Sequence, residues 1–337
     1  MRKADHLIDE VLSLENLEDA LWKASNGRRD RSEVQEVYRE LDRLGNQFRQ
    51  WIWNGQIMEI FTYRRFVIRD PGERVVHTVP FLASVLHHAI INVFGPVLEK
   101  NSITHSYACK GGLANLKALQ AARNFTRGRK AFLRMGIHRF FDSVDQRILM
   151  KSLEDIIDDM DLEDIFNCIL FSYNSTPRKG LPMGTLISHY LGNFHLDPLD
   201  QYIHEVLGCR SYVRFMDEFI LWDNDRARLE IWMDDLTQLL DKNLHLEIAP
   251  DSGTGWSAEG FAFLGYQVTP DSIQLSDEAQ KEFRNQLAQL ESQFFDGEIS
   301  EEELVHRSRA LFSFADHYSG GNWRREIVES SLGWHLY

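Results

Sequence analysis

Stretches of helical periodicity occupy much of the chain. Between residues 32 and 51, apolar side chains recur every three or four positions, which predicts an amphipathic helix with one face packed on a core. Ser32 and Gln35 predict a capping box at its start. Apolar-rich stretches at 81–100 and 113–127 predict two further helices. The tail is also predicted to be helical, with an apolar stripe formed by Phe283, Leu287, Leu290 and Phe294.

Alternating runs predict two β-hairpins. Runs 63–69 and 74–79 flank residues 70–73, Asp-Pro-Gly-Glu, whose Pro-Gly pair suits a type II turn. The arginines of this hairpin are Arg64, Arg65, Arg69 and Arg74. They either contact nucleotide or template phosphates or form a solvated face, and the pattern leaves both interpretations open. A second hairpin is predicted over 212–222, with Asp217 near its turn.

Two further segments join turn signals to helix signals. A strand is predicted to begin at Phe132, to pass through Gly136 to Phe141, and to give way to a helix capped by Asp145. A Gly-Leu-Pro-Met-Gly turn at 180–184 precedes a helix rich in apolar residues. The sequence shows no linker, repeat or low-complexity tract. We therefore expect one integrated unit with several subdomains.

Composition and charge narrow the class of protein. The 337 residues are 43% hydrophobic and 26% charged, as in ordinary globular proteins. The three cysteines are widely spaced, which favours neither a disulfide framework nor a zinc site and suits a reducing cytoplasm. We expect no signal peptide, no membrane span and a cytoplasmic protein. A net charge of −14 argues against broad nucleic-acid binding, although a basic stripe can lie on an acidic body.

Three ordered motifs resemble the polymerase motifs of reverse transcriptases. Residues 136–145, Gly-Ile-His-Arg-Phe-Phe-Asp-Ser-Val-Asp, resemble motif A, and residues 215–218, Phe-Met-Asp-Glu, resemble motif C. Between them, residues 180–189 resemble motif B. Residues 107–112 resemble the fingers loop, and 263–266 the primer-grip strand. The chain is most similar to the reverse transcriptases of diversity-generating retroelements, and more distantly to retron and group II intron enzymes.

This resemblance implies an α+β right-hand polymerase fold, with fingers, a palm built on an antiparallel sheet, and a helical thumb. It also implies a protein encoded by a prokaryote or a phage. The expected parts are an N-terminal helical lead-in at 1–60, fingers at 61–128, a palm at 129–270 with a fingers insertion at about 146–180, and a thumb at 271–337.

The resemblance also implies a site for Mg²⁺, and this site is incomplete. Polymerases of this kind hold two metal ions between carboxylates from motifs A and C. The motif C aspartate is present as Asp217, its neighbour is the longer Glu218, and the motif A aspartate position is Gly136, which offers no ligand. His138, expected on the same strand face as Gly136, is a poor Mg²⁺ ligand. Asp142 is expected to face elsewhere.

Other positions divide into retained and altered ones. By the resemblance, Arg74 contacts the nucleotide, Phe141 excludes a 2′-hydroxyl, and Gly184 lets the template approach. Lys110 in the fingers loop and Ser188 in motif B are further nucleotide or template contacts. At the altered positions this chain departs from the family. It has Ala83-Ser84 where the family has an Asp-Arg pair, and His189 where the family has glutamine. Residues Leu246 to Ala249 stand near motif D, where the family often has a lysine. Residues 277–303 include nine acidic residues but only two basic ones, Lys281 and Arg284. This net negative charge is opposite in sign to the charge expected of a thumb that grips a nucleic-acid duplex.

These features predict a reverse-transcriptase homologue that is inactive or very weak and binds an RNA or a protein partner. The first alternative is a working RNA-directed DNA polymerase of a diversity-generating retroelement, assisted by an accessory protein subunit and Mg²⁺. A template-independent nucleotide transferase needs the same metals. A protein-assembly scaffold would bury the acidic thumb or the N-terminal helix against another chain.

Overall fold

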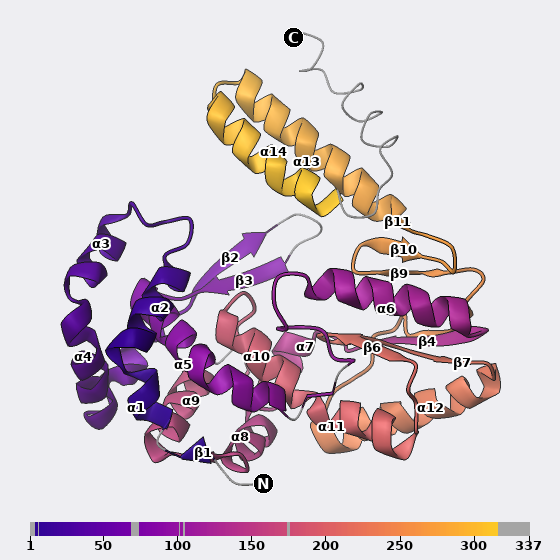
Figure 1. The fold of residues 1–337 in the computed structure, drawn as a ribbon, viewed down its shortest axis with the longest axis horizontal. Helices are drawn as coiled ribbons and strands as arrows, with labels where there is room; N and C mark the ends of the chain where they lie inside the picture. Colours follow the sequence, from indigo (N-terminus) through magenta and orange to yellow (C-terminus); the bar gives the residue numbers. More distant parts are fainter. Residues whose placement is uncertain are drawn as a thin grey trace.

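A computed structural model describes residues 4–5, 7–68, 74–100, 102–103, 105–173 and 176–315. The side chains of residues 4, 5, 68, 74, 310 and 313–315 are outside this description. The chain forms a body of helices and small sheets from which a two-helix hairpin projects (Figure 1). The α+β class predicted from the sequence is confirmed.

The N-terminal part is helical, as expected. Its elements are β1 (Ala4–Asp5), α1 (Leu7–Val11), α2 (Leu14–Ala24), α3 (Ser32–Arg39), α4 (Leu41–Trp53) and the 3₁₀ helix η1 (Gln56–Ile60). The single helix predicted over 32–51 is wrong, because Glu40 leaves helical geometry at φ −101° and ψ 9°. The capping box is also wrong. Ser32 begins α3 without capping it, and the Gln35 amide donates instead to the Arg29 carbonyl at 2.9 Å.

Helix α5 (Phe81–Lys100) is the central helix of this half. It packs against α2, where the Asn16 amide donates to the Ala89 carbonyl at 3.0 Å and accepts from Asn92 at 2.9 Å. By length and apolar composition, α5 is the one described helix that could cross a membrane. We had expected no such stretch. Because 61% of its most apolar window is buried inside the protein, it also has the character of a core helix.

The predicted fingers hairpin is confirmed as β2 (Arg64–Ile68) paired with β3 (Arg74–Thr78) in antiparallel register. Its predicted turn at 70–73 and Arg69 lie outside the described residues. The His77 backbone N–H donates to the Met183 carbonyl at 2.7 Å. This bond joins the hairpin to the turn that resembles motif B.

The palm sheet has four antiparallel strands in the order β6-β7-β4-β8. They are β4 (Ala131–Gly136), β6 (Tyr212–Phe215), β7 (Glu218–Asp223) and β8 (Gly253–Trp256). Helix α12 (Arg226–Leu239) covers one face, and α6 (Ala114–Gly128) lies over the other (Figure 1). Successive side chains of a strand point to opposite faces of the sheet, so each strand contributes to the packing on both sides. Leu133 and Leu221 enter the larger core, whereas Phe132 and Trp222 enter the core beneath α6.

The helices between the palm strands complete the body. They are α7 (Phe140–Ser143), α8 (Gln146–Glu154), α9 (Met160–Ser172), α10 (Leu186–His195), α11 (Asp197–Gln201), the π-helical segments η2 (Tyr202–Val206) and η3 (Leu240–Leu244), with the short strand β5 (Ile157–Asp158) pairing with β1. Asp145 caps α8 as predicted, since its carboxylate accepts from the Arg147 N–H at 3.0 Å. The strand predicted from Phe132 to Phe141 is too long. It ends at Gly136, and Arg139 adopts φ +45° before α7.

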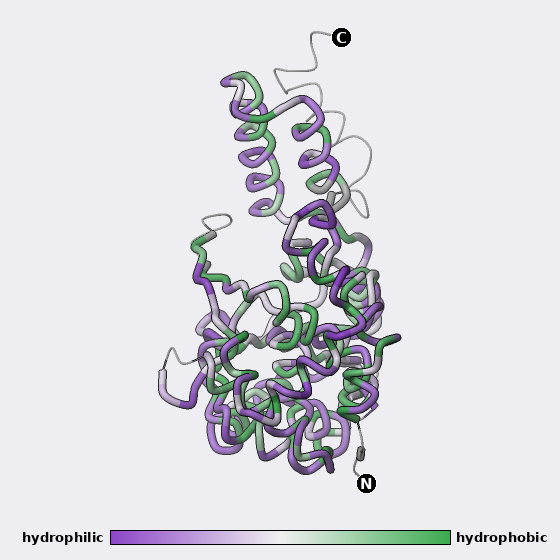
Figure 2. The backbone as a smooth tube through the Cα atoms, turned by 90° about the vertical axis from the view of Figure 1, so that its left-hand side faces the viewer, coloured by the Kyte–Doolittle hydropathy of each residue, from purple (hydrophilic) through white to green (hydrophobic). Residues whose placement is uncertain are grey.

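A small sheet leads into the projecting hairpin. Strands β9 (Phe261–Phe263), β10 (Tyr266–Val268) and β11 (Ile273–Leu275) precede helices α13 (Asp277–Phe295) and α14 (Glu301–Ala315). Figure 2 shows hydrophilic residues along much of α13 and α14. Strand β11 pairs with β10 across the expected palm–thumb boundary at 270, and the subdomain limits stay predictions.

Candidate functional site

The β6–β7 hairpin brings the motif C carboxylates to the end of β4. Phe215 pairs with Glu218 across the hairpin, and Met216 and Asp217 form the turn. Glu218 also lies directly opposite Gly136 on β4. The sequence prediction that motifs A and C meet is therefore correct, and the position facing Glu218 carries no side chain.

Gly136 is fixed by its neighbours on the other side. Its N–H donates to the Ser252 hydroxyl at 3.1 Å, and its carbonyl accepts from the Ala249 N–H at 2.8 Å. A Cβ added at Gly136 would lie 3.3 Å from the Ala249 Cβ. A side chain at this position would therefore need a shift of only a few tenths of an ångström.

Arg134 occupies the strand face that Gly136 leaves open. It precedes Gly136 by two residues and so lies on the same face of β4. Its Nε donates to Glu218 Oε1 at 2.7 Å, and its Nη1 to Asp251 Oδ2 at 3.1 Å. Burial raises the pKa of Glu218, and the Arg134 guanidinium opposes that rise. The Glu218 carboxylate is thus already neutralised by a protein cation.

Asp217 stands at a strained turn. Met216 before it adopts φ +55°, a left-handed conformation that disfavours residues other than glycine. Burial raises the pKa of Asp217, while its own backbone N–H and the Arg214 charge lower it. The turn holds the carboxylate half-buried on a fixed backbone.

A buried polar network under the turn supplies that rigidity. The Arg214 guanidinium, with no exposed surface, pairs with Asp200 through Nε at 2.7 Å and through a second, short contact from Nη2. Its Nη1 donates to Asn193 Oδ1 at 2.8 Å and to the Met216 carbonyl at 3.0 Å. The Tyr212 hydroxyl also donates to Asp200 at 2.6 Å. These charge-assisted bonds satisfy a charge pair that burial alone would penalise.

Asp197 lies beside this network without a hydrogen-bond partner for either carboxylate oxygen among the described residues. It is 5% exposed. Desolvation raises its pKa to about 7, although the nearby Arg214 and Lys110 charges favour ionisation. Asp197 is therefore largely protonated in the folded protein at acidic pH.

His138 and Asp142 were considered as replacement ligands for the missing carboxylate. Strand β4 ends at Gly136, but extended pairing continues through a bridge between Ile137 and Ile248. His138 is exposed, and its N–H donates to the Glu247 carbonyl at 2.7 Å. Its place on the strand face of Gly136 stays a prediction. Asp142 pairs with Arg139 at 3.0 Å. No group of three or more His, Cys, Asp or Glu side chains in the described ranges is arranged to hold a metal ion. The residues present therefore do not fit a two-metal site.

The expected nucleotide and template contacts are in varied surroundings. Phe141 packs edge-on against His189, with ring centroids 5.7 Å apart. A Cβ at Gly184, where φ is +99°, would lie 3.1 Å from the His77 carbonyl, so the fingers hairpin occupies that space. Ser188 is buried and shares a hydrogen bond of 2.7 Å with Thr185.

Lys110 and Arg74 are the two other expected contacts. Lys110 donates to the Ile103 carbonyl at 2.8 Å. Arg74 begins β3, but its side chain lies outside the described part of the chain. Nucleotide or template binding by these residues stays a prediction.

Comparison with known proteins identifies the family. The model of the reverse transcriptase (RNA-dependent DNA polymerase) family matches residues 73–268, more than half of the chain. The chain therefore belongs to the reverse transcriptase family, and the expected right-hand polymerase fold is confirmed.

Two individual relatives are more remote. Over 123 residues, 34% of this chain and 15% of the relative, it is 24% identical to the COX1/OXI3 intron 1 protein of Saccharomyces cerevisiae. The structure of telomerase from Candida albicans, in complex with a fragment of telomeric RNA, aligns with 84% of this chain and 63% of that chain at 11% identity and a TM-score of 0.47. The chain spans less than two thirds of both relatives.

Sequence reasoning missed the cations that organise the site. The sequence could have indicated that Arg134 lies at the site, because residues two positions apart on a strand, such as Arg134 and Gly136, share one face. Arg214 had a weaker one, as a lone charge within an apolar strand. Its partner Asp200 lies 14 residues earlier, on α11, and the fold brings the two side chains together.

An aspartate introduced at Gly136 tests whether Arg134 prevents the site from binding a metal ion. We expect Gly136→Asp alone to gain no stabilisation from millimolar Mg²⁺ or Mn²⁺, because Arg134 would pair with the new carboxylate. The double variant Gly136→Asp/Arg134→Gln should gain about 2 kcal/mol when the metal concentration is well above its dissociation constant. Thermal unfolding with and without metal measures this gain, and adding Asp217→Asn should remove it. Equal metal stabilisation of the unmodified chain would contradict the interpretation.

Asp197 predicts a pH dependence of stability. Its pKa is about 7 in the folded state and about 4 when unfolded, so the folded state holds the extra proton and stability falls as pH rises between these values. Asp197→Asn should remove that fall. The variant should match the unmodified chain near the lower pKa and exceed it above the higher one by about 2–4 kcal/mol. Urea unfolding across this range measures the difference, and parallel pH profiles for the two proteins would refute the role of Asp197.

Proposed function

We propose that this member of the reverse transcriptase family has lost DNA synthesis and serves as a binding protein. The observation that carries the proposal is the pairing of Glu218 with Arg134 opposite Gly136. Two-metal catalysis requires carboxylates that bridge both ions. Here Asp217 is left as the motif C carboxylate without a motif A partner.

The competing function is RNA-directed DNA synthesis in a diversity-generating retroelement, with Mg²⁺ and an accessory subunit. It requires Glu218, His138 or Asp142 to join Asp217 around a metal. Glu218 and Asp142 are instead paired with arginines, and His138 lies beyond the end of β4. This geometry supports the non-catalytic function. A template repeat and variable repeat beside the gene would favour the retroelement function.

Primer extension separates the two functions. With a primed RNA template and either Mg²⁺ or Mn²⁺, we expect the purified full chain to incorporate no more deoxynucleotide than its Asp217→Ala variant. The reason is that a single uncommitted carboxylate does not hold two metal ions in place. A family polymerase in the same buffer serves as the positive control. Robust cDNA synthesis that Asp217→Ala abolishes would overturn the proposal.

A basic cavity favours RNA as one partner. A hollow of about 410 Å³ between α8 and α9 is lined by the exposed cations Arg147, Lys151 and Arg178, by Glu154 and by Phe171. Arg147 is paired with Asp145 at 2.9 Å, so Lys151 and Arg178 are the two lining cations without an ion pair among the described residues. The Arg178 guanidinium lies over the Phe171 ring, 5.3 Å from its centroid. Cations with an exposed aromatic ring suit a single strand, whose phosphates and bases they bind together. This local positive charge contrasts with the net charge of −14.

Charge reversal in this cavity tests RNA binding. We expect Lys151→Glu/Arg178→Glu to weaken binding of a single-stranded oligouridine RNA by at least about tenfold, and the salt dependence of binding to fall. The control is Arg49→Glu/Lys242→Glu, which reverses the same number of exposed cations elsewhere. Fluorescence anisotropy at several salt concentrations measures both. Equal losses in the two double variants would show that the cavity has no special role.

A further inference from the structure

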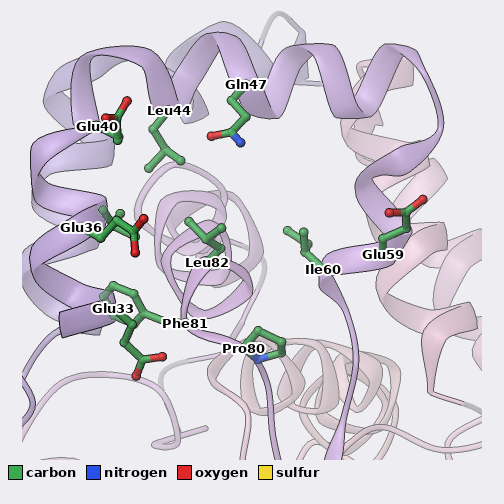
Figure 3. Close-up of a pocket in the computed structure, with 11 residues that line it drawn as sticks. Glu33, Glu36, Glu40, Leu44, Gln47, Glu59, Ile60, Pro80, Phe81 and Leu82 are labelled. Atoms are coloured by element: carbon green, nitrogen blue, oxygen red, sulfur yellow. The ribbon is translucent and has the colours of Figure 1, made fainter. Parts of the chain in front are cut away.

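A further hollow lies in the N-terminal half, and its lining contains none of the palm carboxylates. It has a volume of about 590 Å³ and is formed by α3, α4, η1 and the start of α5. Figure 3 shows the side chains that line it, with Leu82 near the middle of the view. Only Pro80, Phe81 and Leu82 of this lining fall within the residues 73–268 that match the family model. We refer to this hollow as the N-terminal groove.

The rim of the N-terminal groove is acidic. It carries Glu33, Glu36, Glu40 and Glu59, all exposed. Glu33 and Glu40 have long contacts with exposed arginines, at 3.9 Å to Arg31 and 3.5 Å to Arg43. Glu36 and Glu59 form no ion pair within the described part of the chain. The rim therefore has carboxylates that remain available to a cationic ligand.

The floor of the groove is apolar. It consists of Val37, Leu44, Ile60, Pro80, Phe81 and Leu82, with Gln47 as the remaining polar residue. A floor of this kind accepts an aliphatic or aromatic side chain. A ligand that fits both parts combines positive charges with an apolar anchor.

Exposed apolar residues beside the groove point to a protein. On the elements that build it, Trp53 at the end of α4 is 89% exposed and Met58 in η1 is 44% exposed. Tryptophan and methionine are enriched in protein interfaces. Phosphates of an RNA would instead be repelled by the glutamate rim.

We propose that the N-terminal groove binds a cationic amphipathic segment of a partner protein. The apolar anchor of that segment enters the floor, and its lysines or arginines pair with Glu36, Glu40 and Glu59. None of these residues belongs to the palm site or to the basic cavity. The proposal therefore holds whether or not the palm synthesises DNA.

Labelled peptides test the groove directly on the full chain. The probe is a short lysine/leucine peptide, and the matched probes are a lysine/serine peptide and a glutamate/leucine peptide. We expect the lysine/leucine peptide to bind most tightly in fluorescence anisotropy. The triple variant Glu36→Lys/Glu40→Lys/Glu59→Lys should weaken its binding by at least about tenfold. The control Asp296→Lys/Glu298→Lys/Glu302→Lys makes the same change of charge on the projecting hairpin and should leave binding nearly unchanged.

A second variant separates the apolar floor from the rim. Leu82→Ser should weaken binding of the lysine/leucine peptide without changing binding of the lysine/serine peptide. Equal weakening by both triple variants, or equal binding of the two lysine peptides, would overturn the proposal as general charge attraction. Displacement of the peptide by oligouridine RNA would overturn it in favour of RNA. A dimer in sedimentation that the groove triple variant dissociates would show instead that the occupant is a second copy of this chain.

Discussion

The ion pair between Arg214 and Asp200 is the constraint on which the palm depends. It joins β6 to α11, and through Asn193 and the Met216 carbonyl it also reaches α10 and the motif C turn. A fully buried pair of this kind adds little net stability compared with apolar packing, but removing either partner leaves an unpaired charge in the core. Its contribution is therefore specificity. It ties together four segments between residues 186 and 217, and the bond to the Met216 carbonyl supports the left-handed conformation of that residue.

This support is intact although the site above it is altered. Arg214 and Tyr212 lie on the face of the sheet that meets Asp200 of α11. Gly136, Arg134 and Glu218 share the opposite face of the sheet. The two faces of the motif C hairpin can therefore change independently. With Gly136 in β4, the core packing and the buried network are in place, and Arg134 supplies a positive charge to Glu218. A glycine at position 136 is therefore compatible with the packed sheet and with the buried network.

The sequence predicted those parts of the fold that depend on local signals. Periodicity located α5, α6, α13 and both hairpins, and the N-cap of α8 at Asp145 was correct because a capping carboxylate acts within a few residues. The break at Glu40 was missed because the apolar periodicity continues past it, and the end of β4 at Gly136 was also missed. The meeting of Gly136 with Glu218 followed from the ordered motifs. The pairing of Glu218 with Arg134 and the burial of Ser188 required the three-dimensional arrangement.

The close packing of α2 on α5 has a consequence for how the chain is divided. The family match begins at residue 73, yet the most apolar helix of the matched region is covered by α2, through Asn16 and its contacts with Ala89 and Asn92. Without α2, part of the apolar surface of α5 would be exposed to water, and exposed apolar surface promotes aggregation. The start of the family match at residue 73 therefore lies between two parts of the chain that pack against each other.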